Sequence, residues 1–113
     1  MFSILFRLRG RIVVSVLLSI LVPFLILSCQ NVPKPSDDYA LARAALDAAR
    51  SVQAPRHSPG HWHQAENFYR KGQLYYRDQD WEKAKESFLK ARLSAEKAEN
   101  AARLIRQKTG EVL

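Results

Sequence analysis

The chain has a single cysteine among its 113 residues, which excludes an intramolecular disulfide. It also lacks a Gly-rich phosphate loop, a nucleophile elbow and a His-Glu-x-x-His zinc motif. No long block of basic residues is present either. Because these motifs supply the reactive groups of common enzyme and cofactor sites, their absence favours a non-catalytic protein without a cofactor.

The first 28 residues have the pattern of an export signal rather than of a folded domain. Residues 1–11 contain Arg7, Arg9 and Arg11 and no acid, and residues 12–27 contain no charge. The apolar run is shorter than the roughly 20 residues of a spanning helix, and Pro23 removes a helical hydrogen bond within it. The sequence therefore predicts a cleaved signal peptide over residues 1–28, with a permanent membrane anchor as the alternative.

Ile26, Leu27, Ser28 and Cys29 follow one another at the end of this segment. The order of an aliphatic, a tolerated and a small residue before cysteine resembles the lipobox of bacterial lipoproteins. The resemblance implies cleavage between Ser28 and Cys29 and acylation of Cys29, which would hold the protein on a membrane. Because Gln30 follows, it also implies the outer membrane facing the periplasm, if the host is Gram-negative. An unpaired cysteine within a signal anchor is the alternative.

The charge of the chain falls once the predicted signal is removed. Three of the 18 basic residues lie in the signal, which leaves 15 basic and 11 acidic residues, a mild excess of four. This excess does not favour a nucleic-acid partner, which an exported protein would rarely meet. A weak attraction to anionic headgroups or cell-wall polymers is all that it predicts.

The remaining chain divides into a tether and an all-α domain. Residues 29–36 contain two prolines and no periodic apolar pattern, so they predict an extended spacer. Residues 37–113 predict the helical domain, with helices over 37–53, 61–77 and 81–108. The helices are separated by a Pro- and Gly-containing break at 54–60 and a short turn at 78–80.

The ends of these helices carry capping residues. Ser36, Asp80, and either Ser58 or Gly60 are expected to cap the helix starts. Gly110 is expected to end the last helix.

The last helix carries the clearest apolar pattern. Its residues recur at steps of three and four and form what we call the seam: Trp81, Ala84, Phe88, Ala91, Ala95, Ala98, Ala102 and Ile105. We expect the first half of the seam to pack on the helix over 61–77 and the alanine half on the helix over 37–53. If that alanine half stays uncovered, a second copy or a partner helix would cover it.

Part of this pattern resembles one tetratricopeptide repeat. The matching positions lie between residues 68 and 91 and are Phe68, Gly72, Tyr75, Trp81, Ala84, Phe88 and Ala91. The resemblance implies an antiparallel helical hairpin. In it, Gly72 and Ala84 allow close approach of the two helices. Gln79 departs from the repeat, which usually has glycine there, and no second copy of the repeat is present.

The chain as a whole is similar to short alanine-rich bacterial lipoprotein domains of unknown function. The shared features are Cys29, an Ala-rich stretch over 39–49, Ser58-Pro59, and a hairpin over 65–104. The resemblance implies a location in the cell envelope and offers no activity.

Three histidines near the break invite a chemical interpretation. His57, His61 and His63 could bind a metal in principle, but the last two point apart on a helix and no cysteine or paired carboxylate completes a site. Exposed loop and cap positions are the favoured interpretation, so no metal site is predicted. By the same reasoning Ser58 is a cap rather than a nucleophile, and Asp78 and Asp80 are turn residues.

These features predict a lipid-anchored, non-catalytic helical module that contacts another envelope protein or a second copy of itself. Neither a nucleic acid nor a small-molecule substrate is expected. The alternative is a periplasmic lipoprotein that binds glycan or peptide on an aromatic face. That face would comprise Trp62, Tyr69, Tyr76 and Trp81, which at helical spacing are otherwise core residues.

Overall fold

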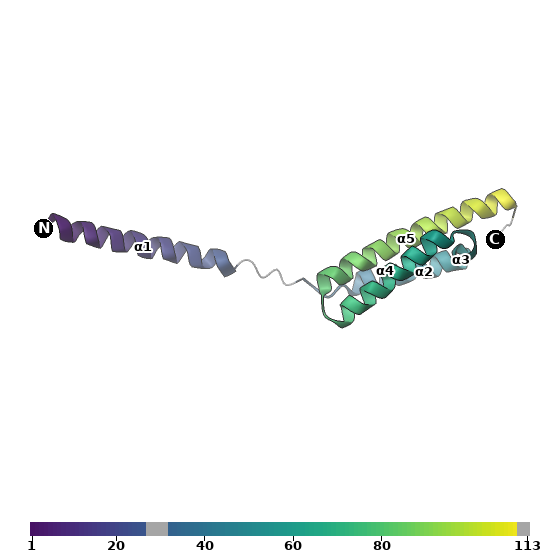
Figure 1. Ribbon diagram of the computed structural model, residues 1–113, viewed down its shortest axis with the longest axis horizontal. Helices are drawn as coiled ribbons and strands as arrows, with labels where there is room; N and C mark the ends of the chain where they lie inside the picture. Colours follow the sequence, from purple (N-terminus) through teal and green to yellow (C-terminus); the bar gives the residue numbers. More distant parts are fainter. Residues whose placement is uncertain (27–31, 111–113) are drawn as a thin grey trace. The chain divides into compact units, whose positions relative to one another are not determined.

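The computed structural model describes residues 1–26 and 32–110, with side chains for 1–17 and 32–110. The described residues form α-helices and no strand, in agreement with the predicted all-α class. The chain divides into two units, Met1–Asn31 and Val32–Leu113 (Figure 1). Cys29 and Ser28, the predicted lipidation and cleavage positions, lie outside the described residues.

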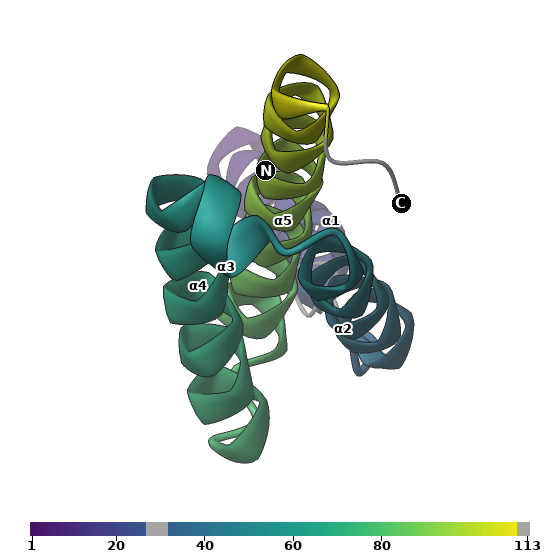
Figure 2. The same cartoon turned by 90° about the vertical axis from the view of Figure 1, so that its right-hand side faces the viewer.

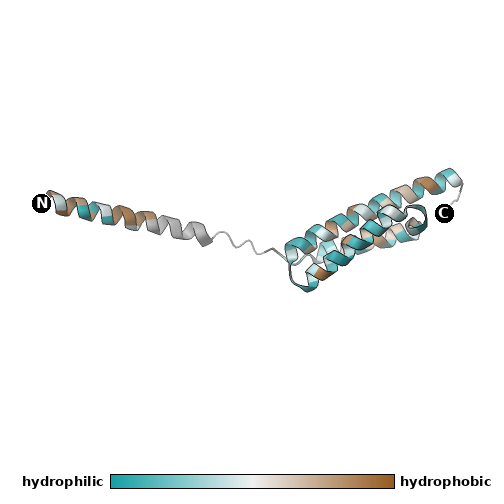
Figure 3. Ribbon diagram, viewed as in Figure 1, coloured by the Kyte–Doolittle hydropathy of each residue, from teal (hydrophilic) through white to brown (hydrophobic). Residues whose placement is uncertain are grey.

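The first unit contains a single described helix, α1, over Phe2–Ile26. The helix continues through Pro23, and its large side chains such as Phe2 and Phe6 are exposed. Figure 3 shows hydrophobic residues along much of the coloured part of this helix. Within the described residues, no helix combines the length and apolar character needed to cross a membrane.

The second unit contains four helices: α2 (Ser36–Ser51), α3 (Ala54–His57), α4 (Pro59–Arg77) and α5 (Trp81–Thr109). Figure 2 looks along this bundle and shows α5 between α4 and α2, with the short α3 joining the other two. The three long helices agree with the predicted ones to within two residues at each end. The predicted break at 54–60 is not irregular throughout, because α3 forms a single helical turn inside it.

The helix ends follow the expected chemistry at α5 but not at α2. The Asp80 carboxylate accepts a hydrogen bond from the Lys83 backbone N–H at 3.3 Å, and Gly110 ends α5 in the left-handed region with φ +73°. The predicted Ser36 cap is wrong. Ser36 is the first helical residue, and its hydroxyl donates to the Lys34 carbonyl at 3.5 Å instead. Ser58 occupies the cap position of α4, but its side chain makes no capping hydrogen bond.

Both interhelical reversals pass through a glutamine with positive φ. Gln53, between α2 and α3, has φ +62°, and Gln79, between α4 and α5, has φ +60°. Residues with a Cβ atom are disfavoured there by steric contact with the backbone. Gln79 therefore adopts a conformation that favours glycine. It stands at the position where a tetratricopeptide repeat usually has glycine.

The seam forms the centre of the bundle. Its six inner positions, from Ala84 to Ala102, are fully buried, whereas Trp81 is half-buried and Ile105 is 37% exposed. The seam is thus covered within one chain, and a partner helix is not needed to bury it. This result removes the covering of an open alanine half as a reason for self-association.

The expected division of the seam between the two flanking helices is wrong. Ala42 of α2 joins the cluster around Phe88, and Trp62 of α4 joins the cluster around Ala98. Hence α2 and α4 both line the whole seam. Alanine explains this, because a row of small side chains lets two helices approach α5 along its length.

Gly72 and Phe88 set the closest approach of α4 to α5. A Cβ atom built on Gly72 would lie 2.7 Å from Cδ1 and from Cε1 of the Phe88 ring. Phe88 is fully buried, so its ring has no open space to enter. Glycine is required at position 72 by this contact, as the hairpin pattern predicts.

Gly72→Ala is expected to destabilise the protein by about 1–3 kcal/mol, since the added methyl group overpacks the core against Phe88. The free energy of unfolding in urea, followed by circular dichroism, measures the effect. Gly60→Ala is the matched control, because Gly60 also lies in α4 and a Cβ there meets nothing within 4 Å. Equal stability of the two variants would show that the Gly72–Phe88 contact does not limit the packing.

Candidate functional site

A groove of about 350 Å³ lies between α2 and α4, and we call it the α2–α4 groove. Both helices pack on α5, and Figure 2 shows them on either side of it. The lining residues come from one face of each helix: Arg43, Leu46, Asp47 and Arg50 of α2, and Glu66, Tyr69 and Arg70 of α4.

The spacing of these residues accounts for their convergence. Positions 43, 46, 47 and 50 of α2 lie three or four residues apart and therefore share a helical face. Positions 66, 69 and 70 do the same on α4. In α2 this face adjoins the buried row that includes Ala42 and Ala49, so the packing of α2 on α5 fixes its direction.

The groove carries three guanidinium groups and two carboxylates. Arg50 Nη1 lies 3.2 Å from Asp47 Oδ1, but both side chains are about 60% exposed, so the ion pair contributes little to stability. Arg43 and Arg70 form no ion pair with another residue in the described part of the chain. Two of the three guanidinium groups of the groove are therefore unpaired, and its lining has three cationic and two anionic side chains.

Arg50 also connects the groove to the core. Its guanidinium carbon lies 5.4 Å from the centroid of the Trp62 ring, within the range of a cation–π contact. Trp62 is only 5% exposed and packs with Leu46 and Ala98. The buried indole of Trp62 therefore packs directly against the Arg50 guanidinium.

Tyr69 belongs both to the groove and to a set of aromatic rings in contact with one another. Its ring centroid lies 5.8 Å from that of Tyr39 and 5.8 Å from that of Phe88. Tyr39 also contacts Tyr76 at 5.7 Å and Phe88 edge-on at 5.2 Å. Tyr76 in turn meets Trp81 at 5.4 Å. These rings fill the end of the bundle where α4 turns into α5.

The two tyrosine hydroxyls titrate differently because they share a hydrogen bond. Burial raises the pKa of Tyr69 to about 12, and the hydrogen bond and the negative charge of ionised Tyr39 add to this effect. The pKa of Tyr39 is lowered, chiefly by the hydrogen bond from Tyr69 and then by one from Gln73. Tyr39 is therefore the first of the pair to lose its proton.

The four aromatic residues of the predicted binding face do not form one surface. Trp62 is buried in the core, whereas Tyr69, Tyr76 and Trp81 are half-buried. Tyr76 and Trp81 lie against each other, away from the cluster that holds Trp62. Tyr39 was not predicted, although its place three residues before the buried Ala42 puts it on the inward face of α2.

The three histidines are likewise not brought together. His57 is half-buried in α3, and His61 and His63 are exposed at the start of α4, where His63 Nδ1 lies 3.7 Å from Glu66 Oε2. No group of three or more His, Cys, Asp or Glu side chains with the arrangement of a metal site occurs among the described residues.

Ser58 and Asp80 both lie at the starts of helices. Ser58 is buried where α4 begins. Asp80 Oδ2 lies 2.9 Å from Lys83 Nζ. The hydrogen bond that the Lys83 ammonium donates is the main cause that lowers the pKa of Asp80.

A second set of cations lies between α4 and α5, and we call it the lysine patch. Lys71, Lys83 and Lys90 surround Phe68 and Tyr75 there, each with its ammonium group 5.7–5.9 Å from the centroid of one of these rings. Two of these lysines are already paired, Lys83 with Asp80 and Lys90 with Glu86 at 2.6 Å. The lysine patch therefore offers less unpaired charge than the α2–α4 groove.

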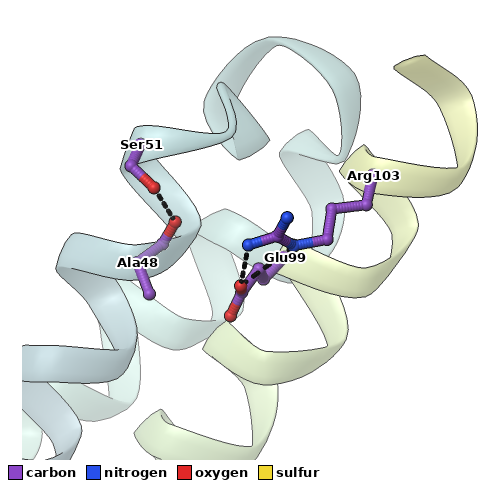
Figure 4. A network of polar contacts seen from close by, with 4 residues as sticks. All are labelled: Ala48, Ser51, Glu99 and Arg103. Carbon is purple, nitrogen blue, oxygen red and sulfur yellow. Dashed lines mark hydrogen bonds and ion pairs between the residues drawn. The ribbon is translucent and has the colours of Figure 1, made fainter. Parts of the chain in front are cut away.

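Polar contacts at the other end of the bundle are local to single helices. Figure 4 shows the Ser51 hydroxyl donating to the Ala48 carbonyl at 2.7 Å, and Arg103 donating to Glu99 Oε1 at 2.8 Å from Nη2. These contacts reinforce the last turn of α2 and the outer surface of α5. None of these four residues lines the α2–α4 groove.

Comparison of the chain with protein-family models, with characterised proteins and with solved structures gives no match.

The Tyr39–Tyr69 pair predicts a loss of stability in alkali. Because the folded pKa of Tyr69 lies above the unfolded value of about 10, its stabilising contribution is complete below pH 10 and disappears between pH 10 and about 12. Tyr69→Phe also removes the hydrogen bond that lowers the pKa of Tyr39, so the comparison is made in a Tyr39→Phe background. There, burial still raises the pKa of Tyr69, and Tyr69→Phe should therefore lose less stability than its parent between pH 8 and pH 11. Urea unfolding at the two pH values measures this difference.

Tyr75→Phe is the control for that measurement, since Tyr75 is a half-buried tyrosine of the same helix outside the pair. It is measured in the same Tyr39→Phe background. A Tyr69→Phe variant that loses stability in alkali in parallel with its parent and with Tyr75→Phe would show that the burial of Tyr69 does not link folding to pH.

Proposed function

We propose that this protein is a lipid-anchored, non-catalytic module of the bacterial cell envelope, and that it contacts another envelope protein through the α2–α4 groove. Residues 1–28 act as a signal peptide that is removed before Cys29. Acyl chains on Cys29 then hold the helical bundle at a membrane surface, which in a Gram-negative host is the outer membrane facing the periplasm.

The observation that carries the proposal is the sequence Ile26-Leu27-Ser28-Cys29 at the end of an uncharged run. Its position agrees with the division of the chain, because the second unit begins at Val32. Cleavage before Cys29 would remove no residue of that unit. The lone cysteine would be consumed by the lipid and would not remain as a reactive thiol in an oxidising compartment.

The arrangement of the bundle supports a binding role rather than catalysis. The α4–α5 hairpin, which resembles a single tetratricopeptide repeat, has its inner face occupied by α2. A partner would therefore meet the outside of the bundle, where the α2–α4 groove is the concave surface with unpaired charge. Protein partners commonly bind such surfaces through charge complementarity.

Glycan binding through an aromatic face is less well supported. Sugar rings stack on the open faces of exposed aromatic side chains. Here Tyr39, Tyr76 and Phe88 pack on one another, and Trp62 is almost fully buried. We therefore place the contact surface at the groove and not at the aromatic cluster.

The lipid anchor is tested by the intact mass and membrane partition of the protein expressed in bacteria. The wild type should begin at Cys29, carry two or three acyl chains and remain with the membrane fraction. Cys29→Ala should accumulate as an unmodified chain that keeps residues 1–28, because the acylated atom is missing.

Ser28→Gly is the control, because it keeps a small residue before the cysteine and should be processed like the wild type. A wild-type chain of full-length mass with an unmodified Cys29 would overturn the proposal. In that case residues 12–27 would be a retained anchor.

A further inference from the structure

We infer that the α2–α4 groove binds an extended acidic polypeptide segment, whose carboxylates pair with Arg43, Arg50 and Arg70. The inference rests on the proposed function, because it gives the chemical class of the protein partner at the same groove. It concerns binding by the bundle alone and does not depend on the acylation of Cys29.

The arginines provide the recognition of charge. Each guanidinium presents a planar fork of donors that matches a carboxylate in a bidentate arrangement. Arg43 and Arg50 lie seven residues apart on one face of α2, a separation of about 10 Å along the helix. Arg70 faces them from α4. The separation corresponds to about three residues of an extended peptide, so carboxylates three or four residues apart could be bound together.

The remaining lining residues favour a polypeptide over a phosphate polymer. Asp47 and Glu66 add acceptors to the groove, and Leu46 and Tyr69 add apolar surface. A polypeptide brings backbone N–H donors for these carboxylates as well as its own carboxylates for the arginines. A polyphosphate chain brings acceptors alone, so it offers no donor for Asp47 and Glu66.

Trp62 provides a direct readout of occupancy. Its ring lies beneath the Arg50 guanidinium at 5.4 Å, so movement of Arg50 towards a ligand changes the surroundings of the indole. Trp81 is the only other tryptophan in the chain. In a Trp81→Phe background, which keeps an aromatic ring against Tyr76, fluorescence therefore comes from Trp62 alone.

The experiment titrates the full chain, purified from membranes in a non-ionic detergent, with a ten-residue poly-glutamate peptide. The Trp62 fluorescence should change and saturate. Combining Arg43→Gln, Arg50→Gln and Arg70→Gln should weaken binding at least about tenfold, as three exposed charge pairs each contribute a few-fold. Because Arg50→Gln also alters the reporter, the affinities of these variants are measured by isothermal titration calorimetry.

The matched control combines Lys71→Gln, Lys83→Gln and Lys90→Gln in the lysine patch, which lowers the net charge equally between α4 and α5. It should bind the peptide within about threefold of the wild type. Equal losses in the arginine and lysine variants would overturn the inference, because net charge alone would then govern binding. Tighter binding of inorganic polyphosphate than of poly-glutamate would overturn it as well.

Two further variants distinguish loss of binding from loss of folding and from loss of the lipid anchor. If the triple arginine variant unfolds, Arg43→Gln alone replaces it, since Arg43 has no ion pair in the described chain whose loss could affect folding. It should weaken binding about two- to fivefold. Cys29→Ala should bind the peptide as well as the wild type, so failure of the lipid anchor and failure of the groove are separate results.

Discussion

The close approach of α4 to α5 at Gly72 and Phe88 determines how the rest of the bundle is arranged. With the Phe88 ring resting against a backbone that has no side chain, the two helices lie near enough for the small residues of the seam to be buried. The same ring meets Tyr39 edge-on, so α2 packs on the same buried face of α5, beside α4. One phenylalanine therefore contacts both helices that flank α5, and its burial adds a large apolar side chain to a core made mainly of alanine, with Leu46, Val52 and Trp62.

An alanine-rich core has a consequence for the surface. Each buried alanine removes little apolar area from water, so the bundle depends on covering its centre from both sides. Once α2 and α4 are both placed on α5, their other faces meet at an angle and leave the groove that holds Arg43, Arg50 and Arg70. The charged groove is thus a product of the packing, and its charge distribution follows from which residues of α2 and α4 happen to lie beside the buried rows.

Much of the fold followed from local rules in the sequence. The steps of three and four along α5 predicted its six buried positions, and Asp80 and Gly110 marked its ends. The placement of α2 along the whole seam did not follow, because alanine fits against almost any helix and carries no information about its partner. The groove was missed for a related reason. Arg43 and Arg70 resemble ordinary solvent-exposed residues in their own helices, and only the rotation of α2 and α4 on α5 makes them neighbours.

Gln53 and Gln79, at the two reversals of the bundle, have positive φ, which is disfavoured for residues with a Cβ atom. Neither turn is favoured by its own sequence, so a hairpin of α4 and α5 alone would gain little from closing before its core forms. The energy that holds each turn must come from helices already packed together. The bundle is therefore expected to fold as one cooperative unit, in which the hairpin and α2 assemble in the same step and partly folded forms remain scarce.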